Sequence, residues 1–432
     1  MRVQTGKGAI PAMVVVAIWS LSLGINLPGL AVTPIEGDLH SIFHGFSDLK
    51  VQLLTVLPNL VIIPFVLLSG RLSMTRHKIP VIAAGVAIYV LSGILYLFSK
   101  SLDGLIWISC LLGAGCGLML PFSTGLIADV FTGKYKLRHM GIVSAIGNIA
   151  LVAATFVVGF LANINWHLPF LVYVLPVISL FLLPWFKKIP TNDLNLDEDG
   201  NPISADKAAN GQPEKLVVPA DDDADFPTAG QKVVGGFYLG RTIWVLLSYF
   251  FFVFATTVPA YYLPNLQGID AEKASIITSC IYFAMFIVGI SLNSVLKFFK
   301  SVSFIVSGGL LLGGFILFAL THSEVGFIIA ASLVGFGQGI AQPLFFDKAT
   351  EICVNNSHAT LAMAYLQVAN YIAIAIVPII INFFAWICGV DKAESTTHFP
   401  FVLNVIFMAI VYFFIIIRVK HFTFGIHKAY YE

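Results

Sequence analysis

The stretch GAGCGLMLP, Gly113 to Pro121, places glycines at three alternate positions of a long apolar segment and ends in a proline. Each glycine lowers the stability of a helix by roughly 1 kcal/mol relative to alanine, so the pattern needs a compensating reason. The same spacing returns 222 residues later as GFGQGIAQP, Gly335 to Pro343. In a membrane, small residues let helix backbones approach closely. The two stretches therefore predict equivalent helices that pack tightly, and the same glycines can also let each half of the chain rock about a central cavity.

The composition indicates a membrane protein, because 58% of the 432 residues are hydrophobic and only 11% are charged. A helix needs about 20 predominantly apolar residues to cross the hydrocarbon core. Hydrophobicity is continuous rather than alternating, which favours helices over a β-barrel. The sequence thus predicts an all-α, multi-pass membrane fold with twelve spans: 10–31, 50–70, 79–99, 104–128, 140–162, 168–186, 241–264, 273–296, 302–321, 325–346, 359–388 and 399–418.

Lysine and arginine residues gather on one side of these spans. If the chain alternates across the membrane, twenty of the 24 fall on the side of both termini, and four fall on the other: Lys50, Lys100, Lys273 and Lys392. The positive-inside bias therefore predicts cytoplasmic termini and insertion in the cell membrane. The first apolar run is too long for a signal-peptide core and lacks an A-x-A cleavage site, so we expect an uncleaved first helix.

The segment from Ile189 to Val234 holds ten of the 23 carboxylates of the chain against three lysines. An acidic sequence with interspersed proline and glycine cannot bury a core. We expect a flexible cytoplasmic linker at 189–235 between an N-terminal bundle, 1–188, and a C-terminal bundle, 236–432. A regulatory or binding role for this linker is the alternative.

The first half of the chain repeats in the second. Shifted by 222 or 223 residues, LKVQLLT from Leu49 matches EKASIIT from Glu272, and the other matches follow in order. Six helices, a linker and six more in the same orientation predict two six-helix bundles related by a pseudo-twofold axis normal to the membrane. The further matched positions are Asp129 with Glu351, Asn148 with Asn370, and HLPF from His167 with HFPF from His398.

Two stretches resemble the major facilitator superfamily of secondary transporters. SGRLSMTRHK, Ser69 to Lys78, is similar to the family loop G-x-L-a-D-r-x-G-r-k. LIADVFTGKYKLRHMGIVSA, Leu126 to Ala145, followed by NWHLPFLVY from Asn165, is similar to the drug/proton antiporter branch. The resemblance implies alternating access and, for that branch, proton-coupled export. The loop candidates are Gly70, Leu72, Arg76 and Lys78, and the departures from the family pattern are Met74, Thr75, His77, Ser109, Ala154 and Thr155.

Ionisable groups within membrane spans are rare and mark functional sites by default. Four lie near the predicted cytoplasmic ends of the fourth and tenth spans: Asp129, Asp347, Lys348 and Glu351. One interpretation is that they pair with loop cations or lock the inner face shut. The other is that Asp347 or Asp129 carries a proton, because burial and a neighbouring cation can tune the pKa of a carboxyl group.

Neutral polar side chains are the candidates for substrate contact. Asparagines can either bond across helices or bind substrate. Gln338 and Gln342, one helical turn apart, share a face and are the first choice. The complete set is Asn26, Asn59, Thr124, Asn148, Gln338, Gln342, Tyr365 and Asn370, with Ser123 and Gln367 also at mid-span.

Prolines flank a tyrosine pair in TTVPAYYLPN, Thr256 to Asn265, and NLPGLAVTP, from Asn26, is parallel to it in the first span. We expect the prolines to break the outer end of the seventh span, because broken helices are tolerated where they line a cavity. Tyr261 and Tyr262 then form either an outer gate or part of an aromatic belt. His167 and His398 are expected to be capping or interface residues.

The function expected is that of a monomeric secondary active transporter for a small neutral or amphipathic organic solute. The resemblance favours proton-coupled efflux of lipophilic, drug-like compounds; uptake of a small metabolite, by symport or facilitated diffusion, is the alternative. A membrane enzyme or a channel is more remote. The sequence contains no Walker loop, GxSxG or HExxH motif, and its five cysteines lack paired spacing, so we expect no catalysis, cofactor, metal or nucleic-acid partner.

Overall fold

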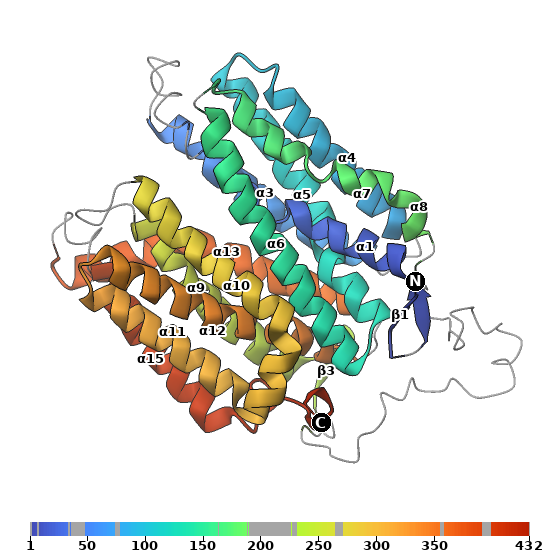
Figure 1. The fold of residues 1–432 in the computed structure, drawn as a ribbon, viewed down its shortest axis with the longest axis vertical. Helices are drawn as coiled ribbons and strands as arrows, with labels where there is room; N and C mark the ends of the chain where they lie inside the picture. Colours follow the sequence, from blue (N-terminus) through green and yellow to red (C-terminus); the bar gives the residue numbers. More distant parts are fainter. Residues whose placement is uncertain are drawn as a thin grey trace, which may run out of the picture.

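The computed structural model is almost entirely helical (Figure 1). Two short antiparallel hairpins accompany the helices: β1, Arg2–Gln4, with β2, Ala9–Pro11, and β3, Val233–Val234, with β4, Phe237–Tyr238. The predicted linker at 189–235 and Arg76, Pro264 and His398 fall largely or wholly outside the described part of the chain. The structure describes residues 2–6, 8–32, 35, 48–73, 78–162, 164–187, 189, 226, 231–263, 271–354, 358–390 and 399–431.

The helices account for all twelve predicted spans. Among the described residues, eight segments are long and apolar enough to cross a membrane; one of them, 273–320, contains two helices, and three shorter apolar helices complete the set. In the first half these are α1, Ala12–Ser20, continued by η1, Leu21–Gly24; α3, Asp48–Leu72; α4, Lys78–Tyr96; α5, Leu102–Val130; α6, Gly133–Ala162; and η3, Leu168–Val174, with α7, Val177–Phe181, and α8, Leu183–Phe186. In the second they are α9, Leu239–Tyr262; α10, Ala271–Phe299; η6, Lys300–Val302, leading into α11, Ser303–Leu320; α12, Glu324–Glu351; α13, Ala359–Ile387; and α15, Phe399–Arg418, before the short η8, Lys428–Tyr430.

Two spans are interrupted rather than continuous. The first ends as a helix at Gly24 and continues in turns, one of which uses Gly29 at φ +85°. The sixth is divided at Pro176 and at Leu182, two residues before Pro184, because proline has no N–H to continue the helical ladder. Backbone groups released in this way are tolerated in a membrane where they face protein or a cavity.

The predicted break of the seventh span at its first proline is wrong. Helix α9 passes through Pro259 and ends at Tyr262. Proline deprives the carbonyl four residues earlier, that of Ala255, of its helical donor. Asn404 of α15 donates a hydrogen bond from Nδ2 to this carbonyl at 2.9 Å, so the helix stays intact. Two other bounds also shift: α6 begins at Gly133 rather than 140, and α12 continues to Glu351 rather than 346.

The alternate glycines place α5 and α12 against two neighbouring helices each. A Cβ added at Gly113 would lie 2.5 Å from the carbonyl oxygen of Pro58 on α3, and one added at Gly115 would lie 2.5 Å from the backbone nitrogen of Tyr89 on α4. In the second half, Gly335 lies against Ile281 of α10 and Gly337 against Leu311 of α11. Ile281 follows Pro58 by 223 positions and Leu311 follows Tyr89 by 222, which is the shift of the sequence repeat, so the repeat is present in the packing as well as in the sequence.

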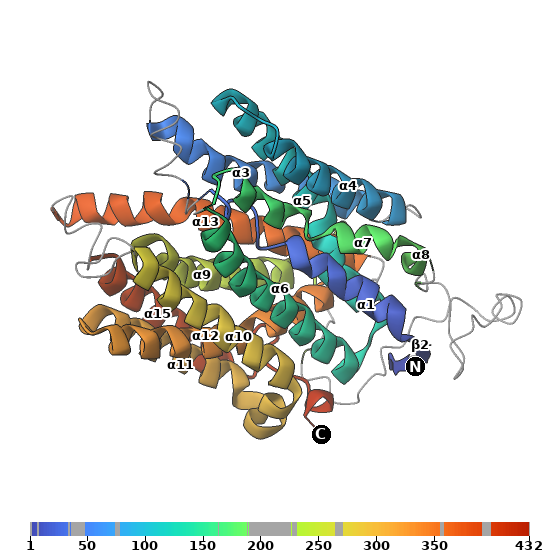
Figure 2. The ribbon, with the colours of Figure 1, turned by 45° about the horizontal axis from the view of Figure 1, so that its top comes forward.

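The two halves meet at the end of the bundle that carries both chain termini, which we call the terminus face (Figures 1 and 2). Helix α6 packs against α10, and α3 packs against α13. A Cβ added at Gly141 would lie 2.7 Å from the carbonyl oxygen of Gly289, and one added at Gly289 would lie equally close to that of Gly141. Gly125 likewise contacts Thr360 across the two halves. These close approaches lie toward the terminus face, so the halves are tightly joined there.

Candidate functional site

A cavity of about 70 Å³ lies between the two halves. The first half contributes η1 with its following turn, α5 and α6, and the second half contributes α12 and α13. Ten of the fourteen lining residues carry amide or hydroxyl groups, and no carboxylate, lysine, arginine or histidine lines the cavity among the described residues. The lining residues are Ser22, Ile25, Asn26, Ser123, Thr124, Val143, Ser144, Gly147, Asn148, Gln342, Phe346, Gln367, Asn370 and Tyr371.

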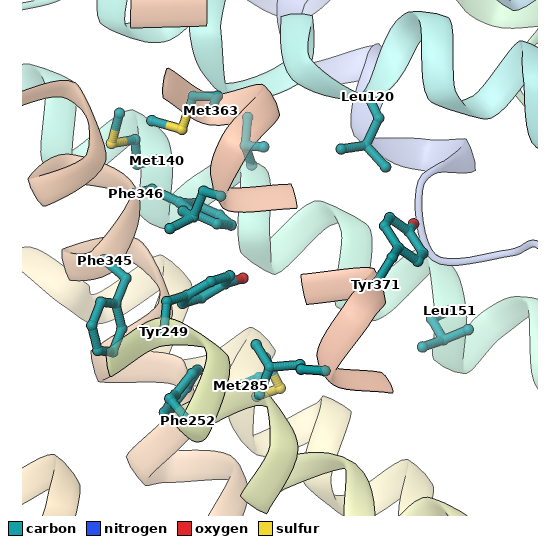
Figure 3. Close-up of a cluster of buried hydrophobic side chains, with 14 of the residues drawn as sticks. Leu120, Met140, Leu151, Tyr249, Phe252, Met285, Phe345, Phe346, Met363 and Tyr371 are labelled. Atoms are coloured by element: carbon teal, nitrogen blue, oxygen red, sulfur yellow. The ribbon is translucent and has the colours of Figure 1, made fainter. Parts of the chain in front are cut away.

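Two aromatic side chains line this cavity. Phe346 of α12 and Tyr371 of α13 belong to the cluster of buried residues in Figure 3, together with Tyr249 of α9. The ring centroids of Tyr249 and Phe346 are 6.3 Å apart. The hydroxyl of Tyr249 donates to Asn370 Oδ1 at 3.5 Å, so α9 contacts the cavity lining although it does not itself line the cavity.

A chain of hydrogen bonds joins the halves through the cavity wall. Asn148 Nδ2 donates to Ser144 Oγ at 3.4 Å, and Ser144 Oγ donates to Gln342 Oε1 at 3.1 Å. The matched residues Asn148 and Asn370 therefore both line the cavity, one from each half. Thr124 differs from these residues: it is 2% exposed, and its hydroxyl has no hydrogen-bond partner among the described residues. A buried hydroxyl without a partner is unfavourable unless a ligand or water satisfies it.

Half of the predicted substrate contacts line this cavity and half do not. Asn26, Thr124, Asn148, Gln342 and Asn370 line it. Gln338 lies one helical turn before Gln342 on α12 and is half-buried, and Asn59 is half-buried on α3. Two of the remaining three lie at the end of α9, where Tyr261 is 40% exposed and Tyr262 is buried. The third, Tyr365, lies in the second turn of α13, and its ring packs against that of Phe237 in β4.

Three polar lining residues, Ser22, Ser144 and Tyr371, were not among the sequence candidates. A signal for two of them exists in the sequence. Ser22 and Ser144 each precede a predicted asparagine by four residues, and residues four apart lie on one face of a helix. Tyr371 directly follows Asn370 and resembles the other buried aromatic residues of the chain, so its sequence gives no such signal.

All four charged candidates are paired near the terminus face. Asp129 of α5 lies 2.6 Å from Lys78 Nζ, within the first half. Asp347 of α12, which is 1% exposed, lies 2.6 Å from Lys136 Nζ of α6 and so joins the two halves. Lys348 and Glu351 pair at 3.0 Å. Of these three pairs, the one between Asp347 and Lys136 joins the two halves, and Lys136 is the partner that the sequence candidates lacked. The two interpretations of these charges, closure of this face and proton transfer, stay predictions.

The remaining motif residues lie where they support this face. Gly70 of α3 contacts Ala364 of α13 across the halves, Leu72 ends α3, and Lys78 begins α4 in its pair with Asp129. His167, at the other end of the bundle, has its Nε2 3.0 Å from the carbonyl oxygen of Ser99, which agrees with a capping role.

Twelve helical spans in two halves around a central polar cavity are the architecture of a multi-pass membrane transporter for small molecules. The sequence profile of the Major Facilitator Superfamily matches residues 13–378, and the chain belongs to this superfamily. The resemblance found in the sequence is thus confirmed.

Relatives in sequence are named for multidrug transport or for drug resistance. The chain is 22% identical over 385 residues to the Multidrug transporter protein MdtP of Bacillus subtilis (strain 168), covering 79% of this chain and 68% of that protein. It is 27% identical over 154 residues to the Quinolone resistance protein NorA of Staphylococcus aureus, covering 35% of this chain and 38% of that protein.

Similar solved structures show the same fold. The human organic anion transporter MFSD10 (TETRAN) superposes with a TM-score of 0.67 at 14% identity, over 93% of this chain and 98% of that one. The proton:xylose symporter XylE, bound to 6-bromo-6-deoxy-D-glucose, superposes with a TM-score of 0.69 at 14% identity, over 93% of this chain and 95% of that one. At this identity the likeness extends to the fold alone.

Proposed function

We propose that the chain exports small, uncharged or amphipathic organic solutes in exchange for protons, by alternating access through the central cavity. The observation that carries this proposal is the lining of that cavity, which consists of amides, hydroxyls, aromatic rings and a few apolar groups. Among the described residues, the lining contains no charged side chain that would bind a strongly charged solute. The names of MdtP and NorA support export of drug-like compounds. The excess of cations on the terminus face supports cytoplasmic termini and a cytoplasmic linker at 189–235.

Asp347 is the proposed proton carrier. Its carboxylate is buried and bonded to Lys136 of the other half. Protonation would neutralise the carboxylate and remove its attraction for the ammonium group, which weakens one of the contacts that hold the terminus face shut. Proton binding would then favour opening on this side, as a ligand favours the state to which it binds more tightly.

Uptake of a small polar metabolite is the second candidate. The observation that favours it is the large share of amide and hydroxyl groups in the cavity lining, which suits a solute with many hydrogen-bonding groups. The fold is compatible with either direction of transport.

Transport by the reconstituted chain tests these alternatives. Proteoliposomes would be assayed over a panel of neutral, cationic and polyhydroxylated solutes, with and without a pH gradient. We expect gradient-driven transport of uncharged solutes by the wild type, loss of that coupling in Asp347→Asn, and full coupling in Asp103→Asn, which alters an exposed carboxylate at the far end of α5. If the rate of transport by the wild type does not change with the pH gradient, the proposed exchange for protons is wrong. A preference for polyhydroxylated solutes would favour the uptake candidate.

A further inference from the structure

The chain beyond α15 folds back onto the terminus face. Residues 419–431, which we call the tail, include four buried apolar or aromatic side chains: Phe422, Phe424, Ile426 and Tyr430. The short helix η8 within the tail packs against both α6 of the first half and α10 of the second (Figure 2). The tail therefore touches both bundles at the place where they meet.

Tyr430 occupies the seam between α6 and α10. The residue is 7% exposed, although it lies only two positions from the end of the chain. It lines a small hollow together with three residues of each helix: Lys134, Leu137 and Arg138 of α6, and Leu292, Asn293 and Leu296 of α10. Separation of the two helices at this face would expose the ring of Tyr430 on one side.

A carboxylate of α12 holds the end of the tail in this position. The hydroxyl of Tyr430 donates to Glu351 Oε1 at 3.4 Å, and His427 Nε2 lies 3.2 Å from the same oxygen. Burial and the neighbouring Asp347 and Glu351 carboxylates raise the pKa of Tyr430 well above its ordinary value, so its hydroxyl stays protonated and able to donate. Glu351 also pairs with Lys348, so the tail joins the charged cluster of α12.

Phe422 anchors the beginning of the tail. Its ring lies 5.0 Å from the ammonium of Lys348, which is only 1% exposed, and 4.2 Å from the guanidinium of Arg241 on α9. The ring of Phe424 packs edge-on against Phe304 of α11 at 5.6 Å. These anchors all belong to the second half, whereas Tyr430 reaches the first.

We propose that the tail is a strap that keeps the terminus face closed: it is fixed to the second half by Phe422, Phe424 and Glu351, and it locks the seam with the first half through Tyr430. The inference rests on the proposed function, because it requires that the halves part at this face during transport. Opening then needs Tyr430 to leave α6, and removal of the strap makes the open state more populated.

The test measures separation of the halves directly and needs no substrate. Spin labels would be attached through unnatural amino acids at Arg71 of α3 and Lys297 of α10, both exposed near the terminus face, which leaves the five native cysteines in place. Distance distributions would be recorded for the full chain, for Tyr430→Ala and for a chain ending at Arg418. Phe413→Ala serves as the control, because it removes an aromatic ring that is 61% exposed on α15. Helicity and elution volume would confirm that each variant is folded.

We expect a long-distance population that rises at least threefold in Tyr430→Ala and in the shortened chain, and that is unchanged in Phe413→Ala. Tyr430→Phe, which keeps the ring in the seam and removes only the hydroxyl that bonds to Glu351, should give a smaller rise. Equal long-distance populations in the wild type and both strap variants would overturn the strap and leave alternating access standing. A single short distance in every sample, including samples with a pH gradient imposed, would overturn the proposed function, and the strap with it.

Discussion

Thr124 lines the cavity, and its hydroxyl is buried without a hydrogen-bond partner among the described residues. A group in this state lowers the free energy of unfolding by about 1–3 kcal/mol. We therefore predict that Thr124→Val, which keeps the shape and removes the hydroxyl, leaves the melting temperature equal or higher while transport falls severalfold. Thr256→Val on α9 is the matched control, because that hydroxyl donates to the Phe252 carbonyl of its own helix. A fall in melting temperature with unchanged transport would assign Thr124 to packing.

The sequence could predict which polar residues are buried but not their depth along a helix. Gln338 and Gln342 share a face of α12, yet only Gln342 lines the cavity, because the cavity extends toward Phe346 rather than toward the opposite end of the helix. Depth depends on the neighbouring helices, and periodicity carries no information about them. Asn148 and Asn370 were more predictable because the repeat relates them, and a site between two related halves uses equivalent positions of both.

At the scale of one helix, the glycines of α5 and α12 allow contacts that a methyl group would prevent. Gly115→Ala places a Cβ 2.5 Å from the Tyr89 nitrogen and 2.9 Å from the Gly85 carbonyl oxygen, and both are backbone atoms that cannot rotate away. Overpacking of this kind costs about 1–3 kcal/mol. We predict a lower melting temperature in detergent for Gly115→Ala and Gly337→Ala, and an equal or higher one for Gly159→Ala and Gly313→Ala, where nothing lies within 4 Å. Equal shifts in both pairs would contradict the packing explanation.

Helix α9 shows why a local rule failed. Its proline removes a helical hydrogen bond, but the released carbonyl of Ala255 is satisfied by Asn404, which is 149 residues away. We predict that Asn404→Leu destabilises the chain by about 1–3 kcal/mol, because it leaves that carbonyl buried and unpaired. In the Pro259→Ala background the new N–H can bond to Ala255, so the same change should destabilise less. Denaturation of the single and double variants gives this coupling, and an additive result would exclude it.

At the scale of the whole molecule, the lengths of the apolar segments predicted the number and order of the helices. The internal repeat predicted which helix of the first half is equivalent to which helix of the second. The structure adds how the halves join. The tail is an example that no pattern in the sequence could supply: Tyr430 and Glu351 are 79 positions apart, and residues 419–431 have neither the length nor the periodicity of a span. Lys136 lies before the predicted fifth span, 140–162, and so belongs to a loop in that prediction. The structure places it in α6, where its ammonium bonds to a carboxylate of the other half.

The pair between Lys136 and Asp347 allows opening to be separated from ordinary destabilisation. Lys136→Ala leaves Asp347 buried without its partner, and breaking a buried ion pair costs about 3–5 kcal/mol. Because this pair joins the halves, part of that energy is recovered when they separate and water reaches the carboxylate. For Lys136→Ala we predict a larger long-distance population between labels at Arg71 and Lys297.

Lys78→Ala is the control. It breaks a pair of the same 2.6 Å length within the first half, so it should lower the melting temperature without widening the distance between the labels. Exchange of the two charges, Lys136→Asp with Asp347→Lys, should restore the short distance. If both alanine variants widen the distance equally, general loosening of the bundle is the cause and the interhalf pair has no special part in closure.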